Sequence, residues 1–199
     1  YISGKDLDSY WRPDRSYMWP KEGYLTFAAY SPSHVREQVQ ISYTPEYGVE
    51  MEDYTVDTDP GKHYDLMFSS RTIDQRKEDM LIDTPGPYDG VQIVFEHVLS
   101  AIVFHVQADR DYSDWGYNVH LTNLSVHNVY STADFRQFAG KESNEVDIAG
   151  MWTGYEGKQE YVAFHTDSDD SIMHDQDADL ILLPQTLDGD GVEPVRIEL

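Results

Sequence analysis

The chain of 199 residues contains no cysteine. This absence excludes disulfide bonds, thiol catalysis and metal or iron–sulfur sites with cysteine ligands. Basic side chains are also scarce, because 14 Lys and Arg stand against 37 Asp and Glu and the formal net charge is -23. A surface of this sign repels nucleic-acid phosphates and anionic lipid headgroups, so we expect neither as a partner.

Long hydrophobic runs are absent too, and the longest one is too short to cross a bilayer as a helix. The sequence opens at Tyr1, with no initiator methionine and no basic segment followed by an apolar leader. We therefore expect a processed or truncated piece, with any export signal or lipid-anchor cysteine upstream of it.

Catalytic and cofactor-binding motifs are missing as well. The sequence has no GxSxG elbow, no GxGxxG or GxxxxGK[ST] loop, and no HExxH or HxH pair. Acidic pairs at glycosidase spacing arise by chance among so many carboxylates, and none lies in a strand–loop context that singles it out. We predict no enzyme activity, no cofactor and no dedicated metal site, and an extracellular hydrolase is the third and weakest hypothesis.

The chain is instead rich in short segments of alternating polar and apolar residues, a pattern typical of β-strands. The predicted strands are Gly23–Tyr30, Gln38–Tyr43, Val91–Glu96, Ala101–Ala108, Tyr117–Leu121, Leu124–Tyr130, Tyr161–His165, Leu180–Leu183 and Val195–Leu199. His63–Ile73 is ambiguous between helix and strand, and Thr132–Phe138 is predicted to hold a short turn. No linker divides the chain, so the pattern predicts an all-β, antiparallel sandwich in a single domain over residues 1–199.

The run VQIVFEHVLSAIVFHVQ (91–107) contains two histidines among apolar residues. Its apolar residues occupy odd positions up to Leu99 and even positions from Ile102 onward. Such a change of phase requires a bulge, a bend or the start of a second strand. His97 falls on the apolar phase, which predicts a buried or half-buried structural histidine, whereas His105 falls on the polar phase, so we do not expect the two to share a metal.

A few other residues are candidates for ligand binding. His120 and His127 could contribute to a metal site with carboxylates, although no standard zinc spacing is present. The acidic tract Asp167–Leu180 and the turn Asp188–Gly191 offer oxygen ligands for calcium but do not fit the EF-hand loop. Aromatic side chains that could stack on sugars are Trp11, Trp19, Trp115 and Trp152.

Five segments, taken in order, resemble the fimbrillin family, the pilus subunits and adhesins (type V pili) of Gram-negative anaerobes. They are SYMWPKEGYLTFAAYSP (Ser16–Pro32), HYDLMFSS (His63–Ser70), VQIVFEHVLSAIVFHV (Val91–Val106), LTNLSVHNVYSTADF (Leu121–Phe135) and LILLPQTL (Leu180–Leu187). The sequence departs from the family pattern at Asp134, where a glycine is expected before Phe135. Family members usually continue into a second sandwich domain, so this chain resembles an N-terminal domain.

The resemblance implies a transthyretin-like β-sandwich of about seven or more strands. It implies a lipoprotein exported to the outer membrane and displayed on the cell surface. It also implies assembly by strand exchange after cleavage at a basic residue, for which Arg12, Arg15 and Arg36 are the early arginines. The family has no catalytic residues. Its signature positions here are expected to determine the fold: Trp19, Pro20, Phe95, His97, Leu99, Pro184 and Gln185.

The leading hypothesis is therefore a non-enzymatic, extracellular fimbrial subunit or adhesin, whose partners are other pilus subunits, surface proteins and host or glycan ligands. The alternative is a surface glycan-binding module, in which calcium could assist. In that alternative, binding would depend on Trp115 or Trp152.

Overall fold

The computed structural model describes residues 15, 17–69, 72–76, 91, 93–137, 149–167, 176–187 and 194–199. These residues contain twelve strands and four short 3-10 helices but no α-helix, which confirms the predicted all-β, antiparallel class. No helix among them is long and apolar enough to span a membrane. The chain forms two compact units: Tyr1–Ala29 with Phe68–Glu96, and Tyr30–Met67 with His97–Leu199.

The described part of the first unit is small. Its strand β1 (Leu25–Phe27) pairs antiparallel with β6 (Thr72–Gln75). The predicted strand Gly23–Tyr30 is thus present in shortened form. Three further short strands lie where the chain passes between the units: β2 (Tyr30–Ser31), β5 (Met67–Ser69) and β7 (Phe95–His97).

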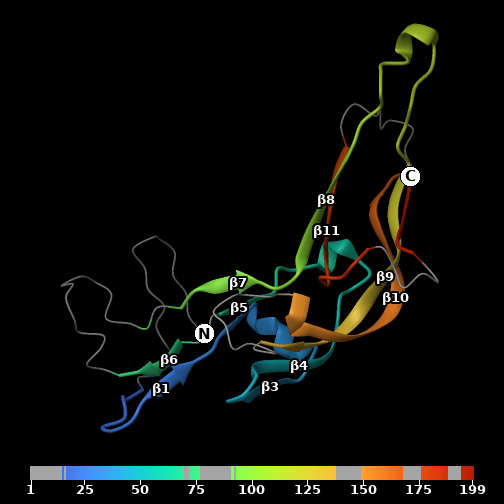
Figure 1. Cartoon of the computed structure of the whole chain (residues 1–199). Helices are drawn as coiled ribbons and strands as arrows, with labels where there is room; N and C mark the ends of the chain where they lie inside the picture. Colours follow the sequence, from blue (N-terminus) through green and yellow to red (C-terminus); the bar gives the residue numbers. More distant parts are fainter. Residues whose placement is uncertain are drawn as a thin grey trace, which may run out of the picture. The chain divides into compact units, whose positions relative to one another are not determined.

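The second unit contains the main sheet, in the order β10-β9-β4-β3, with β12 as an additional partner of β9. Its strands are β3 (Ile41–Thr44), β4 (Gly48–Thr55), β9 (Asn123–Arg136), β10 (Trp152–His165) and β12 (Arg196–Glu198). Strands β9 and β10 form a long curved ribbon (Figure 1). On its other edge, β9 pairs with β12 over Ser125–His127 and with β4 over Thr132–Arg136.

A second sheet in this unit consists of β8 (Ser100–Val106) and β11 (Gln176–Leu182). The even residues of β8 are half-buried and the odd ones are mainly exposed, as the alternating pattern predicts. Leu121 and Leu124 form a buried cluster, and Phe104 and Val106 of β8 and Ala163 and Phe164 of β10 pack against it. Two sheets therefore bury their inner faces against each other, consistent with the predicted β-sandwich.

The core of the second unit is built around large aromatic side chains. Trp152 is 2% exposed, and its ring centroid lies 5.5 Å from that of Tyr54 and 5.0 Å from that of Phe135. The indole Nε1 donates to the Val98 carbonyl at 2.8 Å, which satisfies the polar atom of this buried ring.

Three expectations about single segments differ from the structure. The short turn expected in Thr132–Phe138 begins only at Gln137, because β9 continues to Arg136, and Phe138 lies outside the described residues. Tyr117–Leu121 is no strand: only a bridge at His120 is present. Strand β10 begins at Trp152, well before the predicted Tyr161. Its register with β9 shifts between Thr153 and Glu156, and Gly154 and Gly157 have φ of 66° and 65°. These irregularities interrupt the period-two pattern that would have revealed the strand.

Candidate functional site

A hollow of about 310 Å³ lies in the second unit beside β4 and the 3-10 helix η2 (Pro60–Lys62). Its lining includes aromatic, charged and aliphatic side chains: Tyr54, Asp57, Lys62, His63, Tyr64, Leu99 and Ile181. The volume is at the lower end of the range typical of small-molecule sites. Whether the hollow can bind a ligand or catalyse a reaction depends on how many of its polar groups lack a partner within the protein.

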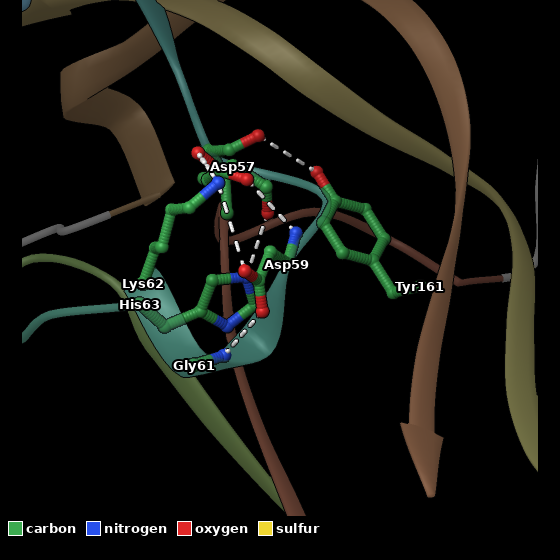
Figure 2. A network of polar contacts seen from close by, with 7 residues as sticks. Asp57, Asp59, Gly61, Lys62, His63 and Tyr161 are labelled. Carbon is green, nitrogen blue, oxygen red and sulfur yellow. Dashed lines mark hydrogen bonds and ion pairs between the residues drawn. The ribbon is translucent and has the colours of Figure 1, made fainter. Parts of the chain in front are cut away.

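The rim of the hollow is a turn held by two aspartates (Figure 2). Asp57 Oδ1 accepts from the Asp59 backbone N–H at 2.9 Å, and Asp59 Oδ1 accepts from the Gly61 N–H at 3.0 Å, which caps η2. Lys62 Nζ lies 3.5 Å from Asp57 and 3.6 Å from Asp59. The pKa of the Asp57 carboxyl is lowered, chiefly by the hydrogen bond from the Asp59 N–H and then by the Lys62 charge.

Both ring nitrogens of His63 are engaged (Figure 2 shows the ring within this network). Nδ1 accepts from the backbone N–H of Ile181 at 3.2 Å, so Nε2 carries the proton and donates to the Asp57 carbonyl at 2.8 Å. The ring also lies edge-on to Tyr161, with 5.8 Å between centroids. His63 thus connects β11 to the turn and is not free to act as a general base.

Tyr54 and Tyr64 line the hollow, and Tyr161 lies beside His63. Burial, followed by a hydrogen bond to the Tyr64 hydroxyl, raises the pKa of Tyr54, and burial raises the pKa of Tyr161 to about 12. The Tyr64 hydroxyl donates to Gln38 Oε1 at 2.6 Å. These raised pKa values reflect desolvation of structural phenols.

The polar groups of the hollow are therefore paired mainly with one another. No serine, threonine or cysteine nucleophile is activated by His63, and no group of three or more metal-ligating side chains lies within the described part of the chain. The arrangement joins β4, η2 and β11 into one structural corner. Sequence reasoning missed this network, although the Asp-x-Asp-Pro-Gly pattern of residues 57–61 was readable as a capped turn.

The signature residues of the first unit lie near its strand pair. Trp19 is half-buried and packs edge-on against Phe27 of β1, with 6.0 Å between ring centroids. Pro20 beside it is exposed, and Phe95 in β7 is half-buried.

His97 ends β7, and β8 begins at Ser100, so the change of phase in this run is a handover between strands, as predicted. The expected burial of His97 is wrong: its side chain is 71% exposed, and Nδ1 lies 2.8 Å from the Asp65 carboxylate. The buried positions of this run change from odd to even before His97, because Val98 and not His97 is the buried residue. Its N–H donates to the Leu66 carbonyl at 3.0 Å and its carbonyl accepts from Trp152. His105 is exposed, as its polar phase predicts, so the two histidines do not differ in burial. Leu99 is half-buried and lines the hollow.

Gln185 completes the edge of β9. Its Oε1 accepts from the Tyr130 N–H at 2.9 Å, and its Nε2 donates to the Tyr130 carbonyl at 3.1 Å and to the Leu183 carbonyl at 3.3 Å. Tyr130 lies between the stretch of β9 that pairs with β12 and the stretch that pairs with β4. The side-chain amide therefore takes the place of a strand residue in that gap, while the carbonyl of Pro184 accepts from the Tyr155 hydroxyl.

Asp134, the departure from the family pattern, also lies at a strand irregularity. Its Oδ1 accepts from the N–H of Asp53 at 2.9 Å, where β4 bulges and Asp53 has a φ of 56°. The carboxylate thus stabilises the bulge opposite β9.

A family model described as fimbrillin-like matches residues 1–198. The chain belongs to the fimbrillin-like family. Among solved structures, one match is a crystal structure of a Bacteroides uniformis protein provisionally described as a cell adhesion protein. It shares 23% identity and a TM-score of 0.45 with this chain, and the match covers 83% of this chain but only 52% of that one. No curated protein matches the sequence.

Membership of the fimbrillin-like family supports a surface-exposed fimbrial or adhesive role, since this is an adhesion family and not an enzyme family. Of the candidate metal ligands, His127 contacts side chains of its own sheet. His127 Nε2 lies 3.0 Å from Ser125 Oγ and 3.4 Å from Glu198, and Nδ1 lies 3.7 Å from Glu160. Of the proposed calcium segments, Asp188–Gly191 and most of Asp167–Leu180 lie outside the described residues, as does Trp11.

The tryptophans proposed for sugar stacking differ sharply in exposure. Trp152 is buried in the core, so the suggestion that it stacks on a sugar is wrong. Trp115 is 63% exposed at the end of the 3-10 helix η4 (Ser113–Trp115). This helix lies at the far end of the connection between β8 and β9, beyond the ends of both strands (Figure 1).

Proposed function

We propose that the fimbrillin-like chain is a non-enzymatic subunit or adhesin of the cell surface that joins a sister subunit by strand exchange at the edge of β8 opposite its partner β11. Export as a lipoprotein of the outer membrane and delivery to a fimbrium are part of the same proposal. Family membership supports the role, and the character of the β8 edge supports the mechanism.

Strand β8 has the properties of an edge that can accept another strand. It pairs with β11 through seven consecutive residues without any register shift, and the described part of the chain places no strand along its other edge. Its sequence, SAIVFHV, has no Asp, Glu, Lys, Arg or Pro, and Val103 at its centre is 70% exposed. A long, regular and uncharged edge is a template for an incoming strand.

The edge formed by β10 provides a contrast within the same unit. Its register shifts at three places, and its exposed residues include Glu156 and Glu160. Bulges and charges are the usual devices that protect an edge from pairing with another chain. The difference favours β8 as the acceptor.

Substitution of the exposed centre of β8 tests this proposal. Val103→Lys places a charge beside the position of an incoming strand, and the control Val162→Lys places the same charge on β10, where Val162 is 37% exposed. In cells that assemble the full-length protein, we expect Val103→Lys to abolish the multimer ladder on denaturing gels and Val162→Lys to preserve it. Both purified variants should unfold at the wild-type temperature. An intact ladder with Val103→Lys, or a wild-type protein that never forms one, would refute assembly at this edge.

A further inference from the structure

We propose that the loop of residues 109–117 is a binding platform for neutral carbohydrate, in which the Trp115 ring stacks on the apolar face of a sugar. This activity is separate from strand exchange, because the loop and the edge of β8 opposite β11 involve different residues. Three features of the loop support the proposal: its internal hydrogen bonds, the exposure of its aromatic rings and the polar side chains around them.

The loop is held by its own hydrogen bonds. The Tyr112 hydroxyl donates to Asp109 Oδ1 at 2.5 Å, and the Ser113 N–H donates to Asp111 Oδ1 at 2.8 Å. The Tyr112 carbonyl accepts from the backbone N–H groups of Trp115 and Tyr117 at 3.0 and 3.2 Å. Gly116, with a φ of 76°, provides the left-handed residue that ends η4. A ring presented on an ordered loop loses little conformational entropy when it binds a ligand.

The orientation of Trp115 is supported from the side. Tyr112 meets it edge-on, with 5.9 Å between centroids and an interplanar angle of 80°. The Arg110 guanidinium lies over one face of the Trp115 ring, 5.6 Å from its centroid, and also contacts Asp109, so a sugar would stack on the opposite face. Despite these contacts Trp115 stays 63% exposed and Tyr117 66% exposed, so neither ring contributes much to a core. An ordered aromatic pair left in water is a candidate contact surface.

Polar side chains around the rings could bind sugar hydroxyls. Asp114 and Arg110 are exposed beside Trp115, and no hydrogen-bond partner of the Trp115 Nε1 lies within the described part of the chain. A pyranose ring carries an apolar C–H face and a rim of hydroxyl groups. An aromatic plane flanked by a carboxylate and a guanidinium matches both features.

Charge and size favour a neutral sugar over three other occupants: an anionic membrane, an acidic sugar and a protein. The loop carries three aspartates and a single arginine, and the whole chain has a net charge of -23, so an anionic membrane or an acidic sugar would be repelled. A stable protein interface buries about 800 Å² per partner. The short loop, with Trp115 and Tyr117 as its main exposed rings, is better matched to one or two sugar rings.

The test uses an array of immobilised neutral oligosaccharides with galactose, mannose or N-acetylglucosamine at their ends. We expect the wild-type protein to bind a subset of these glycans, Trp115→Ala to bind at least about tenfold more weakly, and Trp115→Phe to recover part of the affinity. Tyr43→Ala is the matched control, because Tyr43 is an exposed ring (49%) on β3 of the same unit. Melting temperatures verify that each variant is folded.

Several outcomes would overturn the proposal. These are no glycan binding by the wild type, equal binding by Trp115→Ala, equal losses with Trp115→Ala and Tyr43→Ala, or binding to anionic vesicles instead of glycans. Loss of binding on calcium chelation would also overturn direct stacking in favour of a calcium-mediated contact. Val103→Lys should bind glycan like the wild type whether or not it assembles, so failure of strand exchange and failure of glycan binding are distinguishable.

Discussion

Replacement of Gln185 by leucine tests whether a side-chain amide really completes the main sheet. Leucine has a similar volume but removes the three hydrogen bonds that the amide makes with the backbone of Tyr130 and Leu183. Each such bond contributes about 1 kcal/mol net, and the Tyr130 N–H and carbonyl lose their partner in the gap of β9. Because Gln185 is only half-buried, water compensates in part. We expect the free energy of unfolding to fall by about 2–3 kcal/mol.

The assay is urea denaturation at constant pH, followed by tryptophan fluorescence. A loss of this size should lower the melting temperature by roughly 5–10 °C in a chain of this length. Gln159→Leu on the exposed side of β10 removes the same amide where no strand gap exists, and it should change stability by less than about 0.5 kcal/mol. If Gln185→Leu is as stable as Gln159→Leu, the amide does not act as a strand residue and the reasoning fails.

Two further predictions concern other side chains. His97→Gln should lower the free energy of unfolding by less than about 1 kcal/mol, because the His97–Asp65 pair is exposed. Asp65→Asn should have the same effect in the same thermal melt. A loss of several kcal/mol would mean that His97 is buried. Tyr161→Phe should lose less of its free energy of unfolding than the wild type does when the pH is raised above 10. The folded-state pKa of Tyr161 is raised to about 12 from 10.0, so the unfolded chain releases this proton first, and the contribution present below pH 10 is lost as the pH rises toward 12. Urea titrations at about pH 8 and about pH 11 should show the wild type losing about 1.4 kcal/mol more than the variant, and parallel losses would contradict the assignment.

Much of the sandwich was predictable because alternation depends only on neighbouring residues. Strand β8 and its half-buried even residues follow directly from the pattern AIVFHV. The family resemblance also directed attention to Gln185, whose amide bonds the backbone near the end of β11. The part of β10 before Tyr161 escaped prediction because glycines at bulges interrupt its period. The network around Asp57 escaped prediction because it joins segments more than a hundred residues apart.

The sequence by itself determined the class of the fold, the absence of thiol chemistry, the acidic surface and the family. These properties depend on composition and local order, which a linear chain already contains. Only the tertiary structure decided which side chains face water. Alternation states which residues share a face, but the partner that covers that face comes from distant segments. Val98 is pinned inside by Leu66 and Trp152, so His97 turns outward. For the same reason Trp152 lies in the core, while Trp115, equally aromatic in the sequence, remains exposed on its loop.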